Sequence, residues 1–126
     1  GLASLQYDRR YGFTGMTGES GGGGGGSGGG AQTINTQTAS YVLVLGDAQN
    51  IVEMNVAGAN TVTVPLNASV AFPVGTRILV VQAGAGQTTI TPASSVTLHN
   101  AGAISAQWNA AWLYQRATDE WVMTVG

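Results

Sequence analysis

The sequence predicts an all-β fold, a small antiparallel sandwich or barrel-like knob. Short runs rich in Val, Ile, Thr and aromatic residues recur along the chain, and Gly, Pro, Asn or Asp stops each of them. These turn signals arrive about every 8–12 residues, a spacing typical of small β domains. No stretch of ten residues carries a convincing helical period.

The first strands are expected from residue 41 onward. Residues 41–45 (YVLVL) form a β-branched and aromatic run that Gly46-Asp47 stops. Residues 51–56 follow and end at the turn sequence AGAN. Residues 61–64 (TVTV) alternate strictly before Pro65, so one face of this strand should be buried.

The middle of the chain predicts four more strands. Residues 69–72 are a short candidate before the turn sequence PVG, and residues 76–82 (TRILVVQ) read as a central strand with four apolar residues in succession. After the turn sequence AGAG, residues 88–91 alternate up to Pro92, and residues 96–99 alternate again.

The C-terminal part predicts one strand and a hairpin. Residues 103–108 are interpreted as a strand, with a helix over residues 105–113 as the alternative, because Trp108 and Trp112 are four residues apart. The hairpin consists of residues 111–116 and 121–125, joined by the turn 117–120.

Composition divides the chain into three parts: a head (residues 1–20), a Gly-rich linker (residues 21–30) and a β-rich body (residues 31–126). Glycine loses the most backbone entropy on ordering, so the run GGGGGGSGGG resists helix and strand and serves to separate its neighbours. Ten such residues span about 17 Å on average and about 35 Å at most. An introduced Gly/Ser linker is the alternative interpretation.

The head has the pattern of a docking peptide. Leu5, aromatic residues and an arginine occupy the odd positions 5 to 13, which gives an extended segment one apolar-aromatic face. Aromatic residues and Arg anchor interfaces, and an extended peptide can add to a sheet edge. A disordered terminus is the alternative. The predicted anchor residues are Tyr7, Arg9, Arg10, Tyr11 and Phe13.

Charge is scarce, at 8% of residues, and the chain contains no lysine. No side chain from residue 78 to residue 115 carries a formal charge, which predicts a body covered by sister subunits or a neutral polar surface outside a cell. A net charge of −2 provides no basic footprint for nucleic acid. The absence of cysteine excludes disulfides and thiolate metal sites. No bilayer-spanning run or signal peptide is visible, so an extracellular role would need release by a route other than ordinary secretion, of which lysis is one.

The usual catalytic constellations are not found. His99 has no second His or any Cys to share a metal, and no acid is placed to complete a triad with Ser94 or Ser95, so it is interpreted as a surface or interface residue. Asp47 with Glu53, or Asp119 with Glu120, would be the candidate glycosidase pairs. Turn positions explain Asp47 and the Asp119-Glu120 pair better.

Two further motifs are weak. Gly84-Ala85-Gly86 follows an apolar run, as a dinucleotide-binding motif does, but Thr89 takes the third glycine position and Pro92 interrupts the helix that such a site needs. A tight β-turn is the preferred explanation. Asn67-Ala68-Ser69 fits a glycosylation sequon and receives no role. We predict no enzyme and no cofactor.

Four aromatic residues of the body are candidate interface or glycan-stacking residues: Trp108, Trp112, Tyr114 and Trp121. Packing in a core or between subunits is favoured over sugar binding, because each ring can bury 150–250 Å². In the predicted hairpin, Trp112 and Tyr114 lie on the face opposite Leu113, so one of these two sets should be outside or in an interface.

The body resembles a module of bacteriophage virion proteins. The motifs that carry the resemblance run in order from YVLVLGDA, VEMN and TVTVP through FPVGT and VQAGAGQTTI to the closing WLYQRATDEWV. They are similar to the C-terminal domains of tail fibres and to related fibre or decoration proteins, over roughly residues 35–125. The resemblance implies a β-rich, trimeric knob on the outside of a phage particle, without catalytic residues.

The chain departs from a tail fibre in having a short head and a glycine linker where a fibre has a long shaft. We therefore expect a non-enzymatic homotrimeric capsid decoration protein or head fibre, assembled in the host cytoplasm and displayed on the virion. Its head would dock on the major capsid protein or another virion protein. The alternative is the receptor-binding tip of a tail fibre or tail spike, which would bind a host surface glycan.

Overall fold

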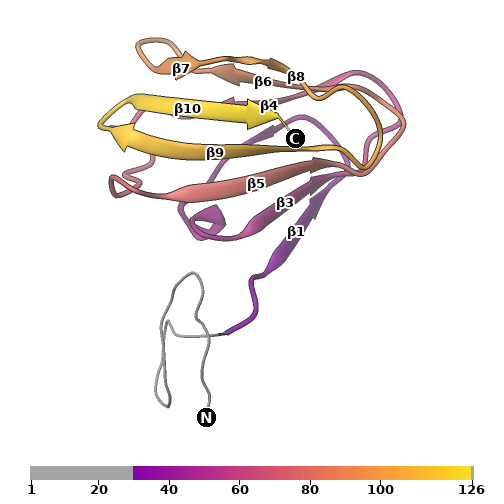
Figure 1. Cartoon of the computed structure of the whole chain (residues 1–126), viewed down its shortest axis with the longest axis horizontal. Helices are drawn as coiled ribbons and strands as arrows, with labels where there is room; N and C mark the ends of the chain where they lie inside the picture. The colour runs from indigo at the N-terminus through magenta and orange to yellow at the C-terminus, as the bar shows by residue number, and fades with distance from the viewer. Residues whose placement is uncertain (1–29, 126) are drawn as a thin grey trace. The chain divides into compact units, whose positions relative to one another are not determined.

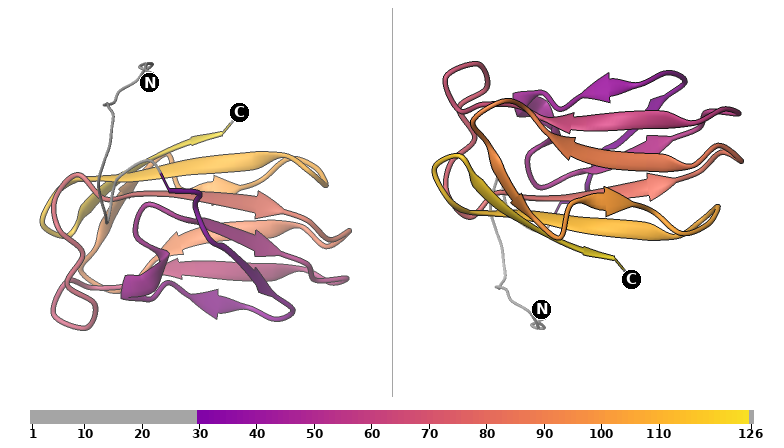
Figure 2. Two further views of the ribbon diagram at one scale, coloured as in Figure 1. Left: turned by 90° about the horizontal axis from the view of Figure 1, so that it is seen from below. Right: turned by 90° about the horizontal axis from the view of Figure 1, so that it is seen from above.

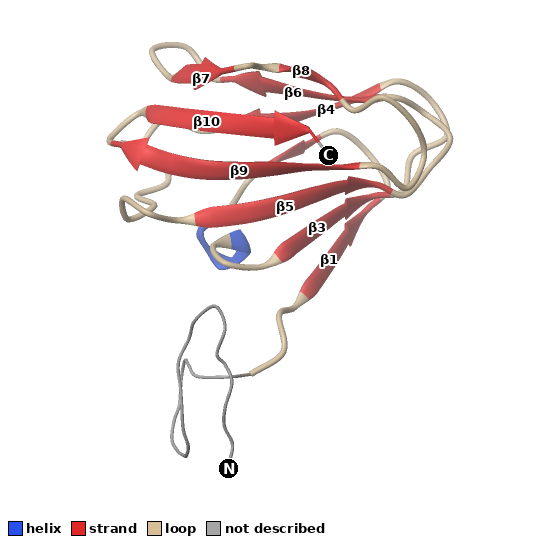
Figure 3. Cartoon of the chain, viewed as in Figure 1, coloured by secondary structure: helices blue, strands red, loops and turns tan. Residues whose placement is uncertain are grey.

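The computed structural model describes residues 30–125, and the regular secondary structure of this part is strand apart from one short 3-10 helix (Figure 1). The all-β prediction is confirmed. A compact unit begins at Thr33. Its strands are β1 (Ile34–Gln37), β2 (Tyr41–Val42), β3 (Ile51–Met54), β4 (Asn60–Val64), β5 (Arg77–Gln82), β6 (Thr88–Pro92), β7 (Thr97–His99), β8 (Gly102–Ala103), β9 (Ala110–Ala117) and β10 (Glu120–Val125). One short 3-10 helix, η2 (Leu45–Asp47), is the single blue element of Figure 3.

The strands form two mixed sheets, one of six strands in the order β1-β3-β5-β9-β10-β7 and one of four in the order β2-β4-β6-β8. The expectation of an antiparallel fold is wrong, because five of the eight strand pairs are parallel: β1–β3, β3–β5, β2–β4, β4–β6 and β7–β10. The predicted C-terminal hairpin is correct, and β9 and β10 pair antiparallel across a two-residue turn.

The first six strands wind as a parallel coil. Successive strands alternate between the two sheets, so each strand pairs with the one two places along, and the strands lie side by side in Figure 2. β3 pairs with β5 with Ile51 opposite Leu79, and β4 pairs with β6 with Asn60 opposite Thr88. Both ladders join residues 28 apart (79 − 51 and 88 − 60). One full turn of the coil therefore uses 28 residues here.

An internal repeat matches this 28-residue turn. Residues 51–64 (IVEMNVAGANTVTV) and 79–92 (LVVQAGAGQTTITP) align without a gap. They share five residues: Val52 with Val80, Ala57 with Ala85, Gly58 with Gly86, Thr61 with Thr89, and Thr63 with Thr91. The repeat is the sequence signal for parallel stacking, since equivalent residues of successive turns lie one above the other.

The loops that follow β3 and β5 form the corners of two successive turns of the coil, and they are in close contact at Gly84 and Gly86. A Cβ atom on Gly86 would lie 1.9 Å from the carbonyl oxygen of Gly58, and one on Gly84 would lie 2.4 Å from the backbone nitrogen of Val56. The amide of Gly86 donates to the carbonyl of Val56 at 2.9 Å. These glycines are needed because only a residue without a side chain allows the two backbones to approach so closely.

A buried polar network lies beside this corner. The Thr88 hydroxyl donates to Asn60 Oδ1 at 2.8 Å, and the Thr88 amide donates to Gln82 Oε1 at 3.1 Å. The side-chain amide of Asn60 donates to the Gly58 carbonyl at 2.9 Å. All three polar side chains are buried, and their mutual hydrogen bonds offset the cost of removing them from water.

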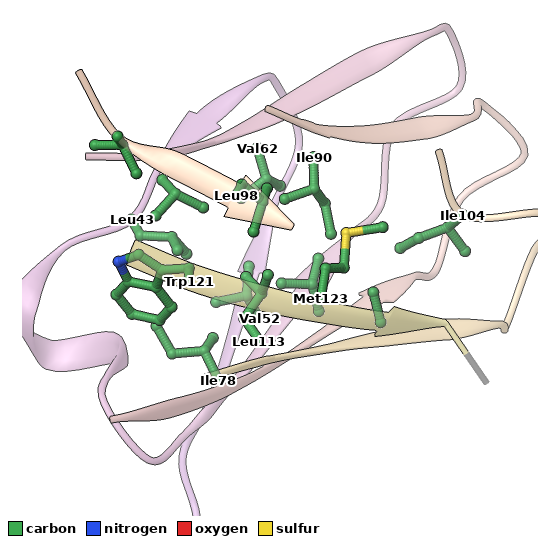
Figure 4. Packing of buried hydrophobic residues seen from close by; sticks show 14 of the residues in the cluster. Leu43, Val52, Val62, Ile78, Ile90, Leu98, Ile104, Leu113, Trp121 and Met123 are labelled. Carbon is green, nitrogen blue, oxygen red and sulfur yellow. The ribbon is translucent and has the colours of Figure 1, made fainter. Parts of the chain in front are cut away.

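The core lies between the two sheets and is apolar (Figure 4). Inward residues alternate with outward ones along each long strand, as in β9, where Ala111, Leu113 and Gln115 are buried. The cluster comprises Leu43, Val52, Met54, Val62, Val64, Phe72, Ile78, Val80, Ile90, Val96, Leu98, Ile104, Ala111, Leu113, Trp121 and Met123.

Several local expectations are wrong. Of the predicted strand 41–45 only Tyr41 and Val42 form a strand, and Leu45 begins the 3-10 helix η2. Residues 69–72 form no strand, because the amides of Ser69 and Val70 turn back to the Leu66 carbonyl. Of residues 103–108 only Ala103 is in a strand, and the alternative helix over 105–113 is replaced by a loop and β9. The sequence analysis also missed β1, a polar strand that pairs at the edge of the sheet.

Candidate interaction surface

The outward side of the six-stranded sheet, which we call the outer face, carries a row of apolar side chains. Strand register places Ile34, Ile51, Leu79 and Trp112 opposite one another across β1, β3, β5 and β9. Trp112 is 44% exposed and Ile34 60% exposed. The next row includes Tyr114, which is 41% exposed. A sheet that faced only water would carry polar residues at these positions.

The central strand β5 explains how the sequence produces this face. Ile78 and Val80 are fully buried in the core, whereas Leu79 and Val81 alternate with them and are only partly covered. The four apolar residues in succession therefore make both faces of β5 hydrophobic. Strands of this composition usually have both faces covered, and in the described residues only the inner face of β5 belongs to the core.

Two charges flank the apolar row. Glu53 on β3 lies opposite Val81 of β5, on one side of the apolar row. Arg77 on β5 lies opposite Tyr114 of β9, on the other side. Neither side chain forms an ion pair or a side-chain hydrogen bond within the part of the chain that the structure describes. They are available to a molecule that contacts the outer face.

The neighbouring charges on the hairpin are already paired. Glu120 accepts from Arg116 at 2.9 Å and lies 2.8 Å from His99 Nε2. The hydrogen bond from His99, with a further contribution from Arg116, lowers the pKa of Glu120. His99 is exposed, as the surface interpretation predicted.

The four candidate aromatics of the body have different environments. Trp112 and Tyr114 lie outside and Leu113 is fully buried, in agreement with the predicted alternation. The prediction that Trp121 is an interface or glycan-stacking residue is wrong. Its side chain is 1% exposed and packs edge-on against Phe72 with ring centroids 5.4 Å apart. Trp121 therefore belongs to the core and is not accessible to a glycan or a subunit.

Trp108 lies in the loop before β9 and is the most exposed large apolar side chain of the described residues, at 67%. Its φ of 69° is left-handed, which is uncommon for a bulky residue. Its amide donates to the Gln82 carbonyl at 2.6 Å, and this contact fixes the loop against the end of β5. The predicted anchor residues Tyr7, Arg9, Arg10, Tyr11 and Phe13 lie outside the described residues.

Asp47 is buried, which the sequence analysis did not anticipate. It is 2% exposed and accepts hydrogen bonds from Tyr41 Oη at 2.7 Å, Asn35 Nδ2 at 3.0 Å and the Val44 amide at 2.9 Å. Burial, and then the hydrogen bond to Asp47, raise the pKa of Tyr41 to about 12. This network fastens β1, β2 and η2 together. Glu53, on the outer face, takes no part in it.

Asp119, from the second candidate pair of carboxylates, also has a structural role. Asp119, in the hairpin turn with φ 57°, accepts a hydrogen bond from the Asn67 amide at 2.7 Å and so ties the hairpin to the loop after β4. Within residues 30–125, no cluster of three or more His, Asp or Glu side chains could hold a metal ion.

Gly84 and Gly86 do not begin a phosphate-binding loop. Strand β6 follows them where a dinucleotide site needs a helix, and their backbones are occupied by the preceding turn of the coil. Close stacking against the preceding turn, rather than the isolated tight turn predicted, explains both glycines. In the described part of the chain, no helix has the length and hydropathy for a bilayer crossing.

Comparison of the chain with protein-family models, with curated proteins and with solved structures gives no match.

Proposed function

We propose that this chain is a non-enzymatic structural protein of a bacteriophage particle, a homotrimeric capsid decoration protein or head fibre on the virion surface. The observation that carries the proposal is the outer face, where Trp112 and Tyr114 are displayed on a central part of a rigid sheet. Aromatic side chains on a firm backbone anchor interfaces between proteins. The resemblance of the motif order to phage fibre modules is the second support for the proposal.

In this proposal the parts of the chain have separate tasks. The head anchors the protein to the major capsid protein or another virion protein through Tyr7, Arg9, Arg10, Tyr11 and Phe13. The linker lets three heads of one trimer reach separate sites, so that weak contacts add through effective concentration. The body presents a neutral surface to the outside.

Particle incorporation tests this proposal. Full-length chain and a variant with Tyr7→Ala, Tyr11→Ala and Phe13→Ala are each produced during phage assembly, and the particles are purified and assayed for the protein. The matched control replaces Gln6, Asp8 and Thr14 by alanine, which changes the opposite face of the same segment. We expect the aromatic variant to be lost from particles and the control to be retained. Equal incorporation of both would refute the anchor.

The second candidate function is a receptor-binding tip that contacts a host surface glycan. Trp108 favours it, because the ring is 67% exposed on a loop whose left-handed backbone is held by a hydrogen bond. An exposed indole can stack on a sugar. This function predicts that the purified chain competes with phage for host cells, and that Trp108→Ala removes the competition. No competition by the unmodified chain would eliminate this candidate.

A further inference from the structure

We infer that copies of this chain contact one another through the outer face, with Glu53 of one copy paired to Arg77 of the next. The inference deepens the proposed homotrimer, on which it rests, by naming the surface and the residues that hold the copies together. Its first support is the apolar row from Ile34 to Trp112, which runs across four neighbouring strands.

The size of the outer face suits a stable protein interface. The six strands are three to eight residues long and lie about 4.8 Å apart, so at about 3.3 Å per residue they cover roughly 500 Å² in projection. The accessible area of a surface carrying side chains is larger than its projection, and a standard interface buries about 800 Å² on each partner.

The charges on the face favour a second copy over a partner of one dominant charge. Glu53 and Arg77 lie on either side of the apolar row, and each lacks an ion pair within the described residues. One acid and one base on the same face suit a closed ring of copies, because Glu53 of each copy can pair with Arg77 of the next while its own Arg77 pairs with the previous copy. A strongly acidic or basic partner would leave one of the two charges facing its own sign.

Charged residues elsewhere in the described part of the chain are paired within the chain, unlike Glu53 and Arg77. On the hairpin, Glu120 is satisfied by Arg116 and His99 of its own chain. Glu53 and Arg77 have no such partner within residues 30–125, and a sister subunit would bring a partner for each of them.

Sedimentation analysis of the full-length chain tests the inference. Trp112 is 44% exposed, which corresponds to about 110 Å² of its ring, and losing the burial of this area should weaken self-association about 100-fold in Trp112→Ala. The matched control is Val74→Ala, which truncates a 60% exposed side chain in the loop before β5, outside the strands that form the outer face. We expect the control to associate as the unmodified chain does.

Charge reversal identifies the pair. Glu53→Arg and Arg77→Glu should each weaken self-association by about 10-fold or more, and the double variant should recover to within about threefold of the unmodified chain. These variants leave the apolar centre intact, so they test the face even if Trp112→Ala folds poorly by circular dichroism. Failure of the double variant to recover would refute the pairing.

Three results would overturn the inference: an unmodified chain that stays monomeric at about 100 µM, an assembly that Trp112→Ala and the charge reversals leave unchanged, or equal weakening by the Val74 control. A monomer whose binding to host cells depends on Trp112 would assign the face to a glycan instead. Particle incorporation, which depends on the head, reports separately on the proposed function. An assembly of two copies that obeys the variant series supports the face and contradicts the trimer.

Discussion

Replacing Gly86 by alanine should strongly destabilise the body. The new Cβ would lie 1.9 Å from the Gly58 carbonyl oxygen and 2.3 Å from its carbonyl carbon, whereas carbon and oxygen atoms in contact are about 3.5 Å apart. The two corners must therefore separate by roughly 1.5 Å. Both obstacles are backbone atoms, so no side-chain rotation relieves the contact.

The magnitude follows from two costs. Overpacking of this kind costs about 1–3 kcal/mol. Separation of the corners also breaks the hydrogen bond from the Gly86 amide to the Val56 carbonyl and leaves a buried donor without its partner, which costs about 1–3 kcal/mol. We expect a loss of about 3–5 kcal/mol, a large part of the stability of a small domain.

The assay is denaturant unfolding followed by circular dichroism, at one protein concentration because association also stabilises the folded state. Gly58→Ala is the matched control: it lies in the same corner of the preceding turn, and its added Cβ would meet nothing within 4 Å. This variant should lie within about 0.5–1 kcal/mol of the unmodified chain. If Gly86→Ala unfolded at the same denaturant concentration as Gly58→Ala, the close stacking of the corners would be refuted.

Three other predictions concern buried groups. Thr88→Val should cost about 1–3 kcal/mol in denaturant unfolding, because the Asn60 side-chain oxygen loses its buried donor; an unchanged midpoint would argue against the network. Trp121→Ala should cost about 3–5 kcal/mol by the same measurement, since the ring is fully in the core, and a small effect would contradict that placement. Tyr41 should titrate at about pH 12, measured as the tyrosinate absorbance that is missing from Tyr41→Phe. Burial and Asp47 raise the folded pKa of Tyr41 above the ordinary value of 10.0. Its contribution to stability is therefore complete below pH 10 and is lost as the pH rises to about 12. Titration near pH 10 in the folded chain would refute the shift.

Local alternation along the chain was sufficient to predict the strand faces. Trp112 and Tyr114 are outside and Leu113 inside because neighbouring side chains of a strand point to opposite faces. The strand pairing was not predictable in this way, since alternation does not say which strand lies alongside. The 28-residue repeat of residues 51–64 and 79–92 carried that information.

The candidate site was predicted only in part. The four apolar residues at 78–81 indicated a central strand, but which charges flank its outer face depends on the register of β3 against β5. Asp47 is next to a glycine in a turn and gave no sign of burial, because its donors come from Asn35 and Tyr41 on two other strands. Such contacts are set by the fold as a whole and leave no local pattern.

The division of the core among the strands bears on when the chain can fold during its synthesis. The last two strands, β9 and β10, contribute Ala111, Leu113, Trp121 and Met123 to the core, and β9 covers the free edge of β5. The ribosome releases these residues after strands β1 to β6, so the parallel coil emerges before the side chains against which it packs. We expect the hairpin, whose strands are joined by two residues, to form quickly once it emerges. Its side chains then complete the core, and the parallel coil can fold fully.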